Sequence, residues 1–242
     1  MCTVSILSTE NGYLIGGNRD ERKSRKKGLP PSIHHENEIP YLSPIDADAG
    51  GTWIAVNSYG FSCCLLNRYS GNFEQDFESV EPISRGKIIP KFMNCKTTQE
   101  GLDVFNNYIE TKKFRPFTLL LIDYTQEVSV LRIDWDGKNT HISNILKPPL
   151  LFVSSGLYQK EVDTVRQEIF RDLITKNATS IELLKKLHSY KIPENGGYSI
   201  AMELDIVQTV SCTIIQYNHE ISMIYTDGIP SKNSDWQKFI LK

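Results

Sequence analysis

Strand-forming segments at both ends of the chain constrain its fold more than any other feature. Residues 3–7 and 13–17 flank Asn11-Gly12, a dipeptide that favours the tight turn of a β-hairpin. The segments 210–216 and 221–226 form a similar pair near the C-terminus. Because the two ends could pair in one architecture, we expect an α+β fold.

Further strands and helices are expected between these ends. The additional predicted strands are 52–56, 61–66, 117–122, 128–133, 140–145 and 151–154. Helices are predicted where apolar residues recur every three or four positions. One begins after Thr97, one runs through Val162 and Leu173, and one begins after Ser180. We predict a single domain over residues 1–242.

The composition excludes several classes of protein. The 242 residues are 40% hydrophobic and 23% charged with a net charge of -2, which argues against nucleic-acid binding. No apolar run approaches the roughly 20 residues of a membrane span, and the N-terminus does not resemble a signal peptide. The five cysteines form no Cys-x-x-Cys pair, so we expect neither a zinc site nor a disulfide framework. The sequence therefore predicts a cytoplasmic protein with reduced thiols, no metal and no cofactor.

Cys2 directly follows the initiator Met1. A small residue at this position normally permits removal of Met1, which would leave one residue carrying both a thiol and a free α-amine. The α-amine titrates at about 7.7–8.0 and the thiol at about 8.5, so the two groups can act as base and nucleophile. Taken alone, the dipeptide Met1-Cys2 favours the interpretation that Cys2 has no chemical role.

A polar tetrad, Asn18-Arg19-Asp20-Glu21, follows the second predicted strand. Counted from the expected turn, Cys2 lies nine residues before it and Asp20 eight residues after it. The hairpin should therefore bring the tetrad beside Cys2. There we expect Arg19 to stabilise a thiolate and Asp20 to hold the α-amine.

Three motifs together resemble one family: Met1-Cys2-Thr3, the tetrad Asn18-Arg19-Asp20-Glu21, and Gly50-Gly51-Thr52-Trp53. They are similar to the NRDE family, also called the Transport and Golgi Organisation protein two-like family. The resemblance implies an N-terminal nucleophile (Ntn) hydrolase, related to choloylglycine hydrolases and acyl-CoA:6-aminopenicillanate acyltransferases. It also implies a four-layer αββα sandwich of two antiparallel sheets covered by helices. Most members of the family have no established substrate.

The resemblance extends to individual residues. Asn67 ends a segment similar to the strand that carries an oxyanion-hole asparagine in choloylglycine hydrolases. Asn18 and Asp20 match the Asn-x-Asp pattern of those hydrolases. Their arginine falls where this chain has Gly17, so the resemblance suggests Arg19 for its role.

Other positions match the family less well. Ser155 stands where relatives often have a second polar asparagine. Gln208 and Cys212 stand where relatives often have an arginine, so no second catalytic arginine is predicted. Trp53 either lines an acyl pocket or belongs to the core.

These observations predict an Ntn-type hydrolase or acyltransferase that uses Cys2 to attack a linear amide or thioester of a small-molecule substrate. The expected catalytic residues are Cys2, Arg19, Asp20 and Asn67, and the expected substrate-binding residues are Asn18, Trp53 and Ser155. The alternative is a non-catalytic carrier of a lipid or haem-like ligand on the same scaffold. The sequence does not predict the substrate or the oligomeric state.

Overall fold

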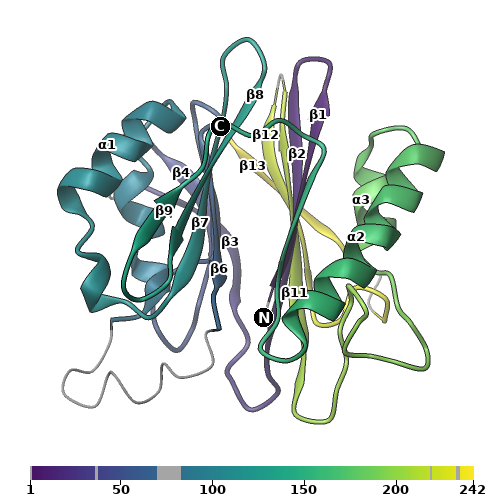
Figure 1. Ribbon diagram of the computed structural model, residues 1–242. Helices are drawn as coiled ribbons and strands as arrows, with labels where there is room; N and C mark the ends of the chain where they lie inside the picture. Colours follow the sequence, from purple (N-terminus) through teal and green to yellow (C-terminus); the bar gives the residue numbers. More distant parts are fainter. Residues whose placement is uncertain (1, 36–37, 70–82, 219, 233–234) are drawn as a thin grey trace.

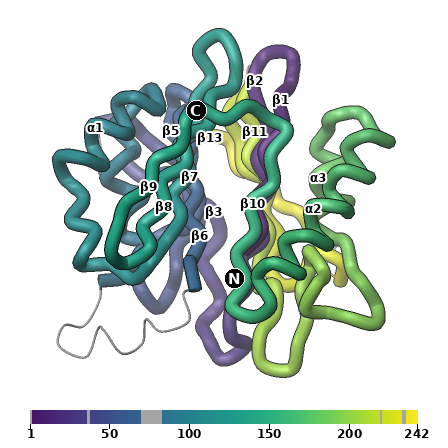
Figure 2. The backbone as a smooth tube through the Cα atoms, viewed as in Figure 1, coloured from purple at the N-terminus to yellow at the C-terminus, as the bar shows by residue number. Residues whose placement is uncertain are grey.

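Two antiparallel sheets packed face to face form the centre of the molecule (Figure 1). The computed structural model describes residues 2–35, 38–69, 83–218, 220–232 and 235–242. Helices cover the outer face of each sheet, as Figure 2 also shows. The predicted four-layer αββα arrangement is therefore confirmed.

The first sheet contains both ends of the chain. Its strand order is β10-β1-β2-β11-β12-β13. The bounds are β1 Cys2–Thr9, β2 Gly12–Arg22, β10 Leu150–Ser154, β11 Val207–Tyr217, β12 Ile221–Asp227 and β13 Gln237–Leu241. Because β2 pairs with β11, the N-terminal and C-terminal hairpins lie in one continuous sheet, as the sequence predicted.

The second sheet has the order β3-β4-β5-β6-β7-β8-β9. The bounds are β3 Leu29–His34, β4 Tyr41–Ile45, β5 Ile54–Asn57, β6 Ser62–Asn67, β7 Phe117–Tyr124, β8 Val128–Trp135 and β9 Thr140–Ile142. The predicted strand over 140–145 is thus shorter than expected.

Sequence patterns missed strands β3, β4 and β13. Strand β3 contains Pro30 and Pro31, and β4 contains Pro44. Proline lacks a backbone donor and is read as a strand breaker, yet an edge strand such as β3 tolerates it. Strand β13 lies at the edge of the first sheet and is largely exposed, so it lacks the apolar pattern of a buried strand.

The helices are α1 Thr98–Tyr108, α2 Gln159–Lys176 and α3 Ile181–His188. As predicted, Thr97 and Ser180 cap α1 and α3, because their side chains accept backbone hydrogen bonds from Glu100 and Leu183. Helix α1 covers the second sheet, and α2 and α3 cover the first (Figure 1). Short 3₁₀ helices lie at Arg85–Lys87, Ile89–Phe92 and Thr111–Lys113. Within the described ranges, no helix is long and apolar enough to cross a membrane.

Alternation along β1 decides which side chains reach the centre of the sandwich. Cys2, Val4 and Ile6 belong to the buried cluster between the sheets. Leu7 belongs instead to the cluster under α2 and α3. Because successive strand residues point to opposite faces, Cys2 lies between the two sheets and its neighbour Thr3 faces the helices.

Candidate active site

The register of the first hairpin places Cys2 directly opposite Arg19. The expected turn at Asn11-Gly12 was wrong by one residue: the turn residues are Glu10 and Asn11, because Thr9 pairs with Gly12. The prediction that the tetrad lies beside Cys2 is therefore confirmed. Directly paired residues share a face of a sheet, so Arg19 lies on the side of Cys2 and Asp20 on the opposite side.

Cys2 opens into a cavity of about 90 Å³, here called the Cys2 cavity. Its lining consists of Cys2, Arg19, Glu21, Arg25, Asp46, Thr52, Trp53, Leu65, Asn67, Ser84, Arg85 and Gly86. Four of the seven site residues expected from the sequence thus meet here: Cys2, Arg19, Trp53 and Asn67.

Arg19 is held in place by two neighbours. Its Nη2 donates to Asp46 Oδ2 at 3.0 Å, and its guanidinium lies 4.6 Å from the centre of the Trp53 ring. Both contacts fix the plane of the guanidinium. Among the described residues, Nη1 of Arg19 has no hydrogen-bond partner, so it remains a buried donor at the cavity.

Asp46 is a counter-ion and not part of a cation site. Its Oδ2 also accepts from Arg25 Nη2 at 2.7 Å. Burial disfavours the ionised carboxylate, but Arg19 and Arg25 together hold the pKa of Asp46 below its usual value. The part of the chain that the structure describes contains no group of three or more His, Cys, Asp or Glu arranged to bind a metal.

Burial raises the pKa of the Cys2 thiol. The nearby Asp20 carboxylate acts in the same direction, whereas the backbone N–H of Asp20 opposes it. Arg19 is paired with Asp46 at 3.0 Å, and its stabilisation of a Cys2 thiolate stays a prediction.

Cys2 is nevertheless expected to be the most reactive thiol of the protein. It is 9% exposed, whereas Cys95 is 3% exposed and the other three cysteines are fully buried. Burial also raises the pKa of Cys95 to about 11. Limited alkylation with iodoacetamide at neutral pH, followed by peptide mapping, should find the label first on Cys2. Faster labelling of Cys95 or Cys212 would contradict this expectation.

Asp20 lies on the helix-facing side of the first sheet with a second arginine. Its Oδ1 accepts from Thr209 Oγ1 at 2.6 Å, and its Oδ2 lies 4.0 Å from Arg166 Nη1. Burial raises the pKa of Asp20, and Arg166 works against that rise. Arg166 Nη1 also donates to Thr3 Oγ1 at 2.6 Å, so the pair is tied to the residue next to Cys2.

Arg166 was missed in the sequence analysis, which found no second arginine. It is 1% exposed and comes from α2, not from the C-terminal strand where relatives suggested one. A signal was present, since Arg166 falls on the helix face of Val162, Phe170 and Leu173. A charged residue on a buried helix face needs a partner and therefore indicates a buried ion pair.

Asn18 also faces the helices and not Cys2. Its Nδ2 donates to the carbonyls of His188 and Ile200 at 2.9 and 2.8 Å, and its Oδ1 lies 3.1 Å from His188 Nδ1. His188 Nε2 in turn lies 2.7 Å from Ser5 Oγ. A Cβ on Gly16 would approach His188 Nε2 to 2.3 Å, so only glycine permits this contact. These bonds anchor α3 to β2 and occupy the Asn18 amide.

Asn67 and Ser155 differ in their relation to the site. Asn67 ends β6 and lines both the Cys2 cavity and a neighbouring cavity of about 280 Å³. Ser155 lines neither of these two cavities, and its hydroxyl donates to the carbonyl of Leu157 at 2.6 Å. The adjacent Ser154 lines the larger cavity and pairs directly with Cys2 in the sheet.

Solved structures share this fold at low sequence identity. An N-acylethanolamine-hydrolyzing acid amidase orthologue from Caenorhabditis elegans is 12% identical with a TM-score of 0.61, and the match covers 100% of both chains. Penicillin V acylase from Agrobacterium tumefaciens is 11% identical with a TM-score of 0.59, over 100% of this chain and 86% of that one. A mutant conjugated bile acid hydrolase from Clostridium perfringens is 13% identical with a TM-score of 0.60, over 100% and 92%.

These likenesses extend over the whole sandwich, so the fold is that of the Ntn hydrolases. No curated protein matches the sequence. The model of the family described as Transport and Golgi organisation 2 matches residues 1–231, which confirms the resemblance stated from the sequence motifs. The chain belongs to the Transport and Golgi organisation 2 family.

Proposed function

We propose that this protein is an Ntn-type hydrolase or acyltransferase that attacks a linear amide or thioester with the thiol of Cys2. The observation that carries the proposal is the position of Cys2 at the start of β1, opening into a cavity shared with Arg19 and Asn67. The hydrolases and acylases of similar fold support the same reaction class by analogy.

The reaction would use the two groups of a processed N-terminal cysteine. The α-amine takes the proton of the thiol, Sγ bonds to the carbonyl carbon, and the amine returns the proton to the leaving group. Water or an acceptor amine or thiol then releases the acyl group from Sγ. The raised pKa of Cys2 makes this internal base necessary, because little thiolate would form at neutral pH without it.

Two donors face the developing negative charge in this proposal. The Asn67 amide and a backbone N–H would stabilise the tetrahedral oxyanion. The unpartnered Nη1 of Arg19 would bind another oxygen of the substrate, and Trp53 would hold the plane of Arg19. The Asp20 carboxylate would hold the α-amine in place from the helix-facing side of the sheet. Arg166, 4.0 Å away, balances its negative charge.

Asn67→Ala is expected to lower kcat and kcat/KM together, by roughly 100- to 1000-fold, the usual loss for one oxyanion donor. The reason is that the amide is needed only when charge develops on the substrate oxygen. Turnover and thermal unfolding of the wild type and the variant should be compared with any ester or thioester substrate that acylates Cys2.

Asn57→Ala provides the matched control for this measurement. The Asn57 amide donates to the carbonyls of Met93 and Cys95, so its loss should mainly lower stability, by about 1–3 kcal/mol. A destabilised but fully active Asn67→Ala protein would assign Asn67 to the turn after β6 and not to catalysis.

The mature protein is expected to lack Met1, which lies outside the described residues. The small side chain of Cys2 permits removal, and the mechanism needs the amine that removal exposes. Intact-mass measurement of protein purified from its native source decides the matter. Retention of Met1 in most of the material would remove the proposed base.

The carrier alternative is favoured by one observation, the raised pKa of the Cys2 thiol. Against it, the Cys2 cavity of about 90 Å³ is small for a haem or a long lipid, since ligand pockets typically reach 300–1,000 Å³. A covalent acyl adduct on Cys2 supports the enzyme. Reversible copurification of a ligand without an adduct supports the carrier.

The state of the cysteines also indicates the cellular compartment in which the protein would act. All five are free thiols and buried. This state supports a reducing compartment such as the cytoplasm, in which a small acyl or amide compound would be the partner.

A further inference from the structure

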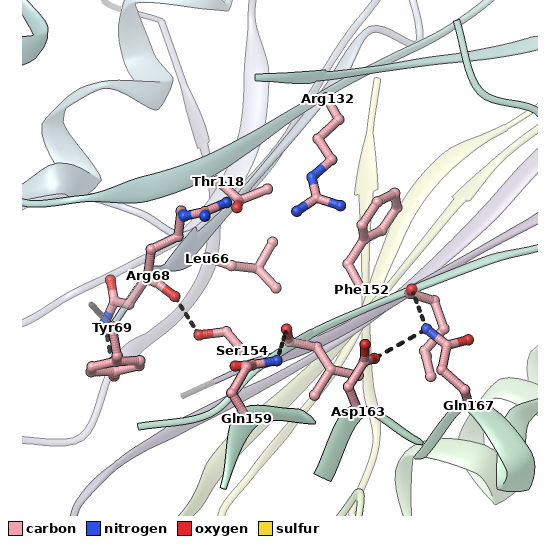
Figure 3. A pocket seen from close by; sticks show the side chains of 13 residues that line it. Leu66, Arg68, Tyr69, Thr118, Arg132, Phe152, Ser154, Gln159, Asp163 and Gln167 are labelled. Carbon is pink, nitrogen blue, oxygen red and sulfur yellow. Dashed lines mark hydrogen bonds between the residues drawn. The ribbon is translucent and has the colours of Figure 1, made fainter. Parts of the chain in front are cut away.

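The larger cavity beside the site, here called the side cavity, has a volume of about 280 Å³ (Figure 3). It shares Asn67 with the Cys2 cavity. Ser154, on its lining, pairs directly with Cys2 between β10 and β1. The side cavity therefore begins one strand away from the thiol.

On one wall of the side cavity, two guanidinium groups form ion pairs with the same carboxylate. Arg68 Nη1 and Arg132 Nη2 each lie 3.0 Å from the same oxygen, Asp134 Oδ2. The other oxygen of Asp134 accepts from Thr118 Oγ1. This cluster has two positive charges and one negative charge, so it can accept one further negative charge.

The arginines remain available to a ligand. Their side chains are 37% and 39% exposed, compared with 15% for Asp134. In the described part of the chain, Nε of Arg132 is a buried donor without a hydrogen-bond partner. Figure 3 shows Arg68 and Arg132 on the same side of the cavity.

The facing wall is formed by α2, and its amide groups are occupied. Gln159 Nε2 and Gln167 Nε2 donate to the carbonyls of Val153 and Leu151 at 3.0 Å, which covers the free edge of β10. Asp163, also on this wall, accepts from Gln167 at 3.2 Å. The strongest unused binding groups are therefore the two arginines, with Asp163 as an opposing charge.

The ring of Phe152 provides an apolar contact between Arg132 and the strand end at Cys2. Phe152 lies two residues from Ser154 on the same face of β10, a spacing of about 7 Å along a strand. The Arg132 guanidinium lies 5.7 Å from the centre of the Phe152 ring. A ligand with its carbonyl at Cys2 and its other end in the side cavity would thus pass Phe152 before it meets Arg132.

We propose that the side cavity binds a carboxylate of the substrate through Arg68 and Arg132, joined to the reacting carbonyl by a short apolar spacer. The single net positive charge of the cluster suits a monoanion better than a phosphate dianion. This inference rests on the proposed function for the position of the reacting carbonyl, and it names the class of substrate that the site accepts.

Binding of 4-phenylbutyrate and its neutral amide, 4-phenylbutyramide, to the Cys2→Ala protein tests the proposal. Titration calorimetry at low salt should give about tenfold tighter binding of the acid. Arg68→Gln and Arg132→Gln should each bring the two affinities within about twofold. Each variant leaves Asp134 paired with the other arginine, so the fold should be retained, which a thermal melt checks.

Arg22→Gln is the matched control, because Arg22 is an exposed arginine that does not line the side cavity. It should leave the preference for the acid unchanged. Asp163→Asn should strengthen acid binding, since it removes the opposing charge. Equal affinities for the acid and the amide, or an equal loss in Arg22→Gln, would overturn the proposal.

The outcome can be separated from that of the proposed function. The binding test uses a protein without the thiol, whereas the proposed function is tested by an acyl adduct on Cys2. If an adduct forms on Cys2 but the acid and the amide bind with equal affinity, the proposed carboxylate subsite is wrong and the proposed reaction stands. If the acid binds more tightly but no adduct forms on the wild-type protein, the proposed reaction is wrong and the carboxylate subsite stands.

Discussion

Arg166→Met is expected to lower the free energy of unfolding by about 3–5 kcal/mol at pH 7, the usual cost of removing one partner of a buried ion pair. Methionine keeps most of the side-chain volume but leaves Asp20 without its nearest positive charge. The carbonyls of Gly197 and Tyr198 lose a donor as well. Urea unfolding followed by circular dichroism measures the effect.

The loss of unfolding free energy in Arg166→Met should increase as the pH rises. Burial raises the pKa of Asp20 in the folded state, so the stability associated with Asp20 is present in acid and is lost as the pH rises. Arg166 limits this loss of stability because it lowers the pKa of Asp20, so its removal raises the pKa of Asp20 further. The difference between wild type and variant should therefore be larger at pH 7 than below about pH 4, the ordinary pKa of an aspartate, where only the part due to the lost hydrogen bonds remains.

His188 should add to this trend. Burial and Arg166 lower the pKa of His188 to about 3, so protonation of the unfolded chain in acid destabilises the fold. Without Arg166 this penalty decreases, which again reduces the difference in acid.

Arg171→Met is the control, because Arg171 lies on the exposed face of the same helix and should cost little. Asp20→Asn combined with Arg166→Met should recover part of the loss. A loss from Arg166→Met that does not change between pH 4 and pH 7 would mean that packing, and not charge, is responsible.

Cys2→Ala is expected to abolish turnover, with a loss on the order of 10⁶-fold in kcat, as for removal of the nucleophile of a hydrolase. The thiol provides the only covalent step of the proposed reaction. The variant should fold normally, since alanine fits the space of the cysteine between the sheets. The measurements are hydrolysis of p-nitrophenyl esters and acyl thioesters, and the intact mass after incubation with each.

Cys64→Ala is the control for this experiment. Cys64 belongs to the same buried cluster as Cys2, but it is fully buried, and burial raises its pKa well above that of an ordinary thiol. Its replacement should leave both turnover and the adduct intact. A Cys2→Ala protein that still turns over substrate at the wild-type rate would exclude Cys2 as the nucleophile.

The sequence determined the main elements of the fold because their signals are local. The first hairpin, predicted from Asn11-Gly12 and found with its turn one residue earlier, depends on neighbours only a few positions away, as do the capping residues Thr97 and Ser180. Strands β3 and β13 gave no such signal. They lie at sheet edges, where the other strands fix their position and an apolar pattern is unnecessary.

For the candidate site, the sequence determined that Cys2 meets the tetrad, but the tertiary structure decided on which face each side chain lies. A strand repeats every two residues, so the pairing of Cys2 with Arg19 and not Asp20 sends the carboxylate to the opposite side of the sheet. The partner of that carboxylate, Arg166, comes from a helix more than a hundred residues away. Neither strand register nor helix packing is a local property of the chain, so only the folded sandwich could reveal them.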